Sequence, residues 1–282
     1  MTVGQWQPYQ ERFPGPGHTA VGDLRVYSDL HSPQLGSRRD LVVCLPPSYR
    51  HTTLAYPVIY MMDGQNLFDE ATAHAGEWQV DETMARLAAE GVEAIIVAVA
   101  NGGDRRTDEY SPFSIPGEGG GQAQQLAQFL IESVVPLVER DFRVHSGRQN
   151  RFLFGSSLGA LFSLYLLHER PDQFGGAGLM SPSLWPAGYA IFPYLRDRPA
   201  TQARIYLDVG TRELSGRFAF LRLHWPSRQY RQAAARLYAL LAAREPAANL
   251  HFFIEPGARH GEAAWARRLP TALRFLLANP TG

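Results

Sequence analysis

The 282-residue chain contains no lysine, so all 27 of its basic residues are arginines. A Schiff-base lysine, a pyridoxal-phosphate enzyme, a Ser-Lys dyad and a Walker A phosphate loop each require an ammonium group. The absence of lysine therefore excludes all four kinds of site from this sequence.

Cysteine is nearly absent as well. The only cysteine, Cys44, lies in the apolar run LVVCLPP, and we expect a small buried hydrophobe rather than a reactive thiol. The sequence also has no H-E-x-x-H motif and no C-x-x-C pair, so we predict no metal site. The run GEGGGQ at 117–122 does not fit G-x-G-x-x-G and follows a loop rather than a strand. We therefore expect no dinucleotide and no other cofactor.

Net charge is also missing, because 27 acidic residues balance the 27 arginines. No excess of one sign is available to attract nucleic acid or an anionic membrane, and neither is predicted as a partner. No apolar run is long enough for a membrane span. The opening segment MTVGQWQPYQERFPGPG lacks the charged and apolar regions of a secretory signal, so the expected location is the cytoplasm. The sequence does not indicate an oligomeric state.

What the chain does contain is an alternation of strand-like apolar runs and helical periodicity. Eight runs are predicted strands: Leu24–Ser28, Asp40–Leu45, Tyr56–Met62, Ala94–Ala100, Arg151–Gly155, Gly176–Met180, Ile205–Val209 and Leu250–Ile254. Five stretches have helical spacing: Val80–Glu90, Gln122–Arg140, Leu158–Arg170, Ser227–Arg244 and Glu262–Ala278. We predict a single α/β domain over residues 1–282, with a mostly parallel eight-stranded sheet, helices on both faces and an antiparallel edge formed by the first two strands.

One segment carries most of the functional information. NRFLFGSSLGALFSLYLL places Gly155-Ser156-Ser157-Leu158-Gly159 between an apolar strand and a helix-prone stretch. This is the G-x-S-x-G pattern in the strand–turn–helix context of a nucleophile elbow, with Ser157 at the N-terminus of a helix. The alternative is a Ser-Gly turn that only caps the helix. The flanking strand and helix favour a nucleophilic serine.

Beyond the elbow, the sequence resembles the Esterase D / enterochelin-esterase-like family of α/β-hydrolases over roughly residues 24–277. The segments that carry the resemblance are RRDLVVCLPPSY, YPVIYMMDGQNLFDE, EWQVDETMARLAAEG, R-x-x-E-Y-x-P at 106–112, GSSLGALFSLYLLHERPDQFGGAGLMSPSLW, IYLDVGTRE and PGARHGEAAW. The resemblance implies the α/β-hydrolase fold and acyl-ester chemistry. It leaves the substrate open, because the family also includes feruloyl and acetylxylan esterases, S-formylglutathione hydrolases and mycolyl transferases.

A serine hydroxyl needs an imidazole to take its proton at neutral pH. Of the nine histidines, His260 is the expected base, because it follows the last predicted strand in a Pro-Gly-x-x-His-Gly loop before the final helix. An exposed loop histidine is the alternative. The resemblance places the acid at Glu213. Asp208, late in the preceding strand, is its rival, and a Ser-His dyad that depends little on an acid also stays open.

The oxyanion hole needs two backbone N–H donors aimed at the developing charge. Leu158, directly after the nucleophile, is expected to supply one. The resemblance implies that Gln65, in the loop after the third predicted strand, supplies the other. Gly64 is expected to let this loop turn toward the substrate, and we interpret Asp63 as a structural residue that holds it.

Trp185, Trp225 and Arg106 are the residues expected to bind substrate. The two tryptophans follow the sixth and seventh predicted strands, at the carboxyl ends where α/β sheets bind ligands. Ordinary core aromatics and a solvated arginine are the alternatives.

The predicted function is a carboxylic ester hydrolase that cleaves a small-molecule ester through an acyl-enzyme. Acyl transfer to a sugar or alcohol and a binding module without catalysis are the competing hypotheses.

Overall fold

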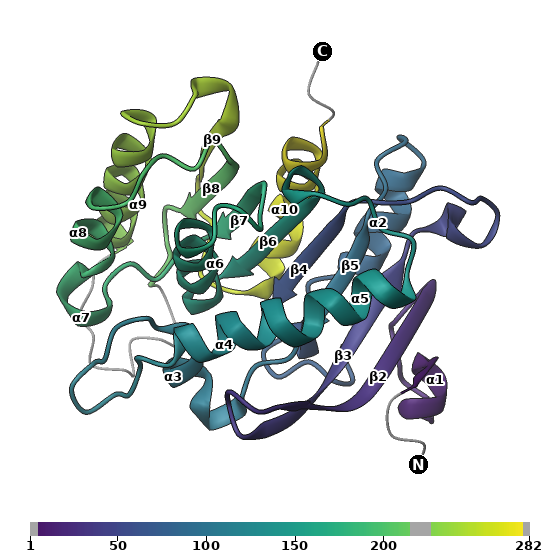
Figure 1. Ribbon diagram of the computed structural model, residues 1–282. Helices are drawn as coiled ribbons and strands as arrows, with labels where there is room; N and C mark the ends of the chain where they lie inside the picture. Colours follow the sequence, from purple (N-terminus) through teal and green to yellow (C-terminus); the bar gives the residue numbers. More distant parts are fainter. Residues whose placement is uncertain (1–4, 215–226, 279–282) are drawn as a thin grey trace.

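The computed structural model describes residues 5–214 and 227–278. Its described strands form one sheet in the order β1-β2-β3-β5-β4-β6-β7-β8-β9 (Figure 1). The strands are β1 (Trp6–Pro8), β2 (Asp23–Ser32), β3 (Ser37–Leu45), β4 (Val58–Met62), β5 (Ile95–Val99), β6 (Arg151–Ser156), β7 (Gly176–Met180), β8 (Arg204–Gly210) and β9 (Leu250–Glu255).

All eight predicted strands are present, but the expected count of eight is wrong. The additional strand, β1, has only three half-buried residues, and its last residue is a proline without an N–H group. It pairs with β2 at the edge of the sheet. So short a run has no periodicity that sequence analysis can detect.

Parallel pairing brings the candidate site together. β5, β4, β6, β7, β8 and β9 pair in parallel, whereas β1, β2 and β3 form the antiparallel edge. Every residue of β4 and β5 is buried, as the continuous apolar runs predict. Carboxyl ends of parallel strands meet at one edge of a sheet. The segments that follow β4, β6, β8 and β9, which carry Gln65, Ser157, Glu213 and His260, therefore lie at the same edge.

Helices cover both faces of the sheet (Figure 1). They are α1 (Tyr9–Arg12), α2 (Val80–Ala88), α3 (Arg106–Tyr110), α4 (Ala123–Phe129), α5 (Val135–Asp141), α6 (Leu158–Glu169), α7 (Pro186–Tyr189), α8 (Ile191–Arg196), α9 (Ser227–Ala242) and α10 (Glu262–Leu277). A π-helical turn over Leu130–Val134 joins α4 to α5 within the stretch predicted as one helix. The four short helices α1, α3, α7 and α8 were not predicted, because each has at most six residues and too few turns to show a period.

Two large buried clusters and a small third one, formed by Val209, Tyr230 and Ala234, fill the space between the sheet and its helices. One large cluster lies under α4, α5, α6, α8 and α9, and the other under α2 and α10. Trp78 and Trp265 meet in the second cluster, with ring centroids 5.4 Å apart. Cys44 of β3 lies in the same cluster and is 5% exposed, as its apolar context predicts. Burial raises the pKa of its thiol.

Candidate active site

Ser157 occupies the turn between β6, which ends at Ser156, and α6, which begins at Leu158. Its backbone has φ 54° and ψ −123°, a conformation that side-chain-bearing residues rarely adopt and that costs of order 1–3 kcal/mol. The Ser157 N–H donates to the carbonyl of Met180, 3.0 Å away, and its own carbonyl accepts from the Ser183 N–H at 3.0 Å. The neighbouring segment therefore holds the strained turn in place.

The two glycines of the pattern permit this geometry. A Cβ atom on Gly155 would lie 2.5 Å from the carbonyl carbon of Gly159, so any side chain there would collide with the first turn of α6. A Cβ atom on Gly159 would lie 3.0 Å from Cβ of Met62 and 3.3 Å from Oδ2 of Asp63. The helix thus approaches both its own strand and the loop after β4 at distances that only glycine allows.

His260 and Glu213 form a close pair. His260 Nδ1 lies 2.6 Å from Glu213 Oε2, with 7% of the histidine side chain and 0% of the glutamate side chain exposed. The second oxygen, Oε1, accepts from the Ser181 hydroxyl at 2.7 Å and from the Gly210 N–H. Burial acts to raise the pKa of Glu213, but the His260 imidazole and these two donors hold it below its usual value. The carboxyl group is therefore ionised at neutral pH.

Asp208, the rival for the acid, has a different partner. It is fully buried in β8, and its Oδ2 lies 2.9 Å from Nε of Arg268. Its Oδ1 accepts from the Ser181 N–H at 3.2 Å. Burial raises the pKa of Asp208 to about 7, although the nearby guanidinium opposes the rise. The carboxylate in contact with Nδ1 of His260 is that of Glu213.

Tyr230 of α9 lies beside both Ser157 and His260. Its ring meets the imidazole edge to face, with centroids 5.5 Å apart. Burial raises the pKa of the Tyr230 phenol, and contacts with the hydroxyls of Ser183 and Ser157 oppose that rise. The tyrosine hydroxyl donates to the carbonyl of Ser181 at 2.8 Å. Ser157 and His260, 103 positions apart in the sequence, thus share a buried neighbour.

A chain of hydroxyl groups leads away from the candidate nucleophile. Ser157 Oγ lies 3.0 Å from Ser183 Oγ, which lies 3.1 Å from the Tyr230 hydroxyl. The Tyr230 hydroxyl in turn donates to the Ser181 carbonyl. Ser157 is thus linked through Ser183 and Tyr230 to the segment that follows β7.

The loop after β4 contacts the first turn of α6. Gln65 lies in a 3₁₀ turn, η2 (Gly64–Asn66), that follows Asp63, whose φ is 57°. A Cβ atom on Gly64 would lie 2.8 Å from backbone atoms of Ala98 and Val99 in β5, so this glycine serves close approach rather than a positive φ. The loop and the start of α6 therefore lie side by side. Because Leu158 is the first residue of α6, its N–H has no partner within the helix.

Arg106 holds this loop through Asp63. Its Nε and Nη2 atoms lie 2.7 and 2.8 Å from the two carboxylate oxygens, a bidentate pair. Asn101 donates to the same carboxylate at 2.7 Å, and the Asp63 N–H donates to the Tyr110 hydroxyl at 2.9 Å. Asp63 thus has the partners expected of a structural residue. Arg106 is tied to the protein through two of its nitrogens, and substrate binding by this arginine stays a prediction.

Of the two tryptophans expected to bind substrate, the structure describes only Trp185. Trp185 is half-buried and directly precedes α7, in the segment after β7. Trp225, with the nearby Phe218–Phe220 and His224, lies outside the described residues. Sequence analysis singled out neither Ser181, Ser183 nor Tyr230. The SPSLW segment that follows β7 contains the two serines, whereas Tyr230 lies in the predicted helix over Ser227–Arg244 without a motif of its own.

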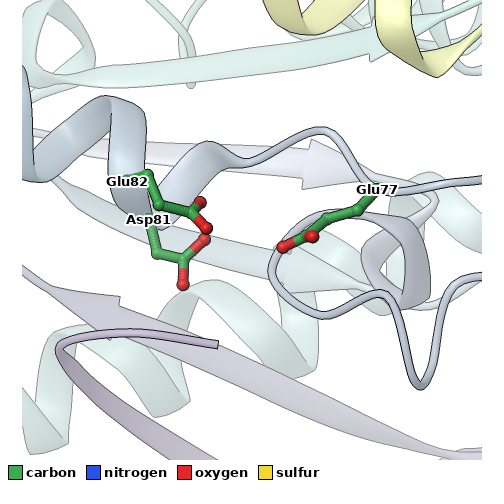
Figure 2. A group of neighbouring side chains, drawn as sticks. All are labelled: Glu77, Asp81 and Glu82. Atoms are coloured by element: carbon green, nitrogen blue, oxygen red, sulfur yellow. The ribbon is translucent and has the colours of Figure 1, made fainter. Parts of the chain in front are cut away.

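A cluster of carboxylates lies at the start of α2. Oxygen atoms of Glu77, Asp81 and Glu82 lie within 4.8 Å of one another, and Figure 2 shows the carboxylates of Asp81 and Glu82 facing each other. Asp81 is 2% exposed and accepts from the Val21 N–H at 2.7 Å. Burial, reinforced by Glu82, raises the pKa of Asp81 to about 8. With this raised pKa, Asp81 is largely protonated at neutral pH, which reduces the repulsion between the two carboxyl groups.

Comparison with known proteins identifies the family. A family model described as "Putative esterase" matches residues 32–276. The chain belongs to this esterase family. It is 29% identical to the ferri-bacillibactin esterase BesA of Bacillus subtilis, over 49% of this chain and 51% of that protein. It is 33% identical to a siderophore triacetylfusarinine C esterase of Aspergillus fumigatus, over 46% of this chain and 44% of that protein. The esterase thus spans about half the length of these two curated relatives.

Solved structures show the same fold. The siderophore hydrolase EstA from Aspergillus nidulans superposes with a TM-score of 0.70 and 22% identity, covering 94% of this esterase and 97% of that chain. The enterobactin esterase FES from Shigella flexneri, solved in the presence of enterobactin, superposes with a TM-score of 0.71 and 18% identity. The match covers 93% of this esterase and 61% of that chain. The predicted α/β-hydrolase fold, the family and the class of carboxylic ester hydrolase are confirmed. Among the described residues, no helix combines the length and apolar character needed to cross a bilayer.

Proposed function

We propose that residues 1–282 form one catalytic domain that hydrolyses a small-molecule carboxylic ester through an acyl-enzyme on Ser157. The contact that supports this most is the 2.6 Å pair of His260 and Glu213 at the edge of the sheet where the strained Ser157 turn lies. A buried carboxylate on Nδ1 fixes the imidazole tautomer in which Nε2 carries no proton and can act as a base. The acid in this proposal is Glu213.

The reaction follows from these roles. Ser157 Oγ attacks the ester carbonyl carbon while His260 takes the hydroxyl proton. Collapse of the tetrahedral intermediate breaks the ester C–O bond, and the alcohol leaves with that proton. Water, deprotonated by His260, then attacks the acyl-enzyme, and the carboxylic acid departs as Ser157 regains its proton.

Two backbone amides would stabilise the oxyanion. The Leu158 N–H begins α6, and the Gln65 N–H lies in the loop that contacts the first turn of that helix. Each such donor contributes about 3–4 kcal/mol to the transition state in measured cases. The Arg106–Asp63 pair would hold the second donor in place, so these two residues act through the loop.

The names of the relatives suggest a substrate class. Several are esterases of siderophores, and one is an endo-1,4-beta-xylanase/feruloyl esterase from Xylanibacter ruminicola. Siderophore esters, catecholate esters among them, and feruloyl esters therefore belong in a first panel, beside acetyl esters and a glutathione thioester. The half-buried Trp185 and the aromatic residues after β8 are the side chains we expect to contact an aryl group.

The test is turnover of this panel and of p-nitrophenyl esters by the wild type and by Ser157→Ala. We expect a loss of roughly 10⁴–10⁶-fold in kcat for the variant. Ser163→Ala is the control, because it removes another serine hydroxyl of the same region, which is buried and donates to a carbonyl within α6. Activity that persists in Ser157→Ala and covalent labelling by a fluorophosphonate at another residue would refute the proposal.

A further inference from the structure

Ser181 occupies an unusual position directly behind the candidate acid. It follows β7, is fully buried, and has a φ of 42°. Its N–H donates to the carbonyl of Asp208 at 3.0 Å, and its own carbonyl accepts from the Tyr230 hydroxyl. Its backbone is therefore fixed from two sides, by β8 and by α9, in a conformation that would otherwise be unfavourable.

The Ser181 hydroxyl connects three side chains. It accepts from Trp265 Nε1 at 3.2 Å and from Arg268 Nη2 at 3.0 Å, and it lies 2.7 Å from Glu213 Oε1. The indole and guanidinium groups can only donate, and an ionised carboxylate can only accept. The direction of these bonds is thus determined: both α10 side chains fill the lone pairs of Ser181, and its proton is given to Glu213.

Arg268 is itself held rigidly. Its side chain is 2% exposed, with Nε 2.9 Å from Asp208 Oδ2 and Nη1 3.3 Å from Glu255 Oε2. The carboxylates of Asp208 and Glu255, on neighbouring strands, thus balance the buried charge of Arg268. Its third nitrogen, Nη2, is directed toward Ser181. A donor bond from a charged group strengthens the acidity of the hydroxyl that receives it.

We propose that Ser181, polarised by Arg268, is a positioning residue for the candidate acid. This inference rests on the proposed function, in which Glu213 orients His260. With the Ser181 hydroxyl and the Gly210 N–H both on Oε1, the carboxylate cannot rotate without losing two donors. Oε2 is thereby kept toward Nδ1 of His260.

The hydrogen bond from Ser181 to Glu213 also affects how strongly this carboxylate attracts a protonated imidazole. A donor on Oε1 disperses the negative charge of Glu213, so removing this donor strengthens the attraction between the carboxylate and an imidazolium ring beside it. The other titratable or charged groups facing this pair are Asp208 from β8, Tyr230 from α9, Arg268 from α10 and Glu255 at the end of β9. Removal of the Ser181 hydroxyl alone leaves all four of these groups in the sequence.

Ser181→Ala is the direct test, measured as kcat and KM for a p-nitrophenyl ester over a range of pH. We expect kcat to fall about 10-fold, since a hydrogen bond to a charged group is lost. We expect the acid-side midpoint of kcat/KM to move upward by about 0.5–1 pH unit, with KM nearly unchanged. Ser181→Gly removes the hydroxyl and also relieves the positive φ, so the same shift in both variants assigns the effect to the hydroxyl.

Ser163→Ala serves as the structural control, because it deletes a buried hydroxyl that bonds only to a backbone carbonyl. A shift in Ser181→Ala but not in Ser163→Ala supports the inference. An unmoved midpoint, with or without a loss of rate, overturns it. If Ser181→Ala does not fold, Arg268→Lys, which keeps the charge beside Asp208, should give a smaller shift of the same sign, and no shift overturns the inference. Loss of the Ser157 dependence of turnover would instead refute the proposed function.

Discussion

Glu109→Gln tests how far the fold depends on a buried charge pair near the candidate site. Arg39 of β3 donates through Nη1 and Nη2 to the two oxygens of Glu109 in α3, each at 2.9 Å. Only 5% of the arginine side chain and none of the glutamate side chain is exposed. Arg106, which holds the loop after β4, begins the same helix. The pair therefore anchors α3 to the sheet.

The magnitude follows from burial. The amide keeps the shape of the carboxylate but removes the negative charge that balances the buried Arg39 cation, which costs about 3–5 kcal/mol. Unfolding entropy near 60 °C is about 2.1 cal/mol/K per residue. For the 282 residues this gives a fall in Tm of about 1.7 °C per kcal/mol, and of about 5–8 °C in total.

A matched control exists at the surface. Arg274 donates through Nε and Nη2 to both oxygens of Glu90, at 2.8 and 2.7 Å, with 47% of each side chain exposed. Both pairs are bidentate Arg–Glu contacts, although the surface pair uses Nε and Nη2 instead of Nη1 and Nη2 and is far more exposed to water. We expect Glu90→Gln to leave Tm unchanged within error, because solvent and salt screen such a pair.

The assay is thermal unfolding followed by calorimetry and by circular dichroism, for the wild type and both variants in the same buffer. Equal shifts for Glu109→Gln and Glu90→Gln would refute the argument from burial. A shift below about 1.5 °C for Glu109→Gln would do so as well, because it corresponds to less than about 1 kcal/mol.

Four further expectations concern the site and its surroundings. Glu213→Gln should lower kcat by roughly 10²–10⁴-fold in steady-state assays, because the amide cannot stabilise the imidazolium. Gly155→Ala should destabilise the fold by about 1–3 kcal/mol in urea unfolding, since its Cβ would lie 2.5 Å from Gly159. The pKa of Asp81 is raised from 3.8 to about 8, so the folded chain keeps a proton that the unfolded chain releases, and wild-type stability falls as pH rises through that window. Asp81→Asn removes this loss and should exceed the wild type in Tm at about pH 9 but not at about pH 4. EDTA should leave turnover unchanged, because the proposed steps use protein groups alone.

Each of these has a contrary outcome. Wild-type turnover in Glu213→Gln would point to Asp208 or to a Ser-His dyad. Unaltered unfolding of Gly155→Ala would mean that α6 can move away from β6. A Tm difference for Asp81→Asn that is the same at both pH values would show that the carboxyl does not titrate in this range. Inactivation by EDTA with recovery on adding a divalent cation would direct attention to the carboxylates near Glu77.

Sequence patterns predicted the elements that are long and locally encoded. The apolar runs of β4 and β5 and the periodicity of α2, α6, α9 and α10 appear where they were expected. The placement of β5 between β3 and β4 was not predicted. Strand order depends on how the crossover connections run, and local sequence patterns do not reveal it. The short α3 was missed for lack of turns.

For the site, local motifs located Ser157 and His260, and resemblance suggested Glu213. Long-range contacts could not be read in the same way. Nothing near Arg268 in the sequence indicates Ser181, 87 residues away, as its partner. Arg106 was expected at the substrate because arginines suit anionic ligands, yet its guanidinium pairs with Asp63, a partner supplied by the fold.

The buried Cys44 gives the protein an internal reporter. Its thiol is 5% exposed and packs in the cluster under α2, so we expect disulfide reagents to react with it slowly in the folded protein. The rate of its modification under native conditions would then report how often this half of the molecule becomes more exposed, without any added label. With one thiol and no lysine, a cysteine introduced elsewhere on the surface would be the single fast-reacting position, suitable for attaching a dye beside the catalytic edge.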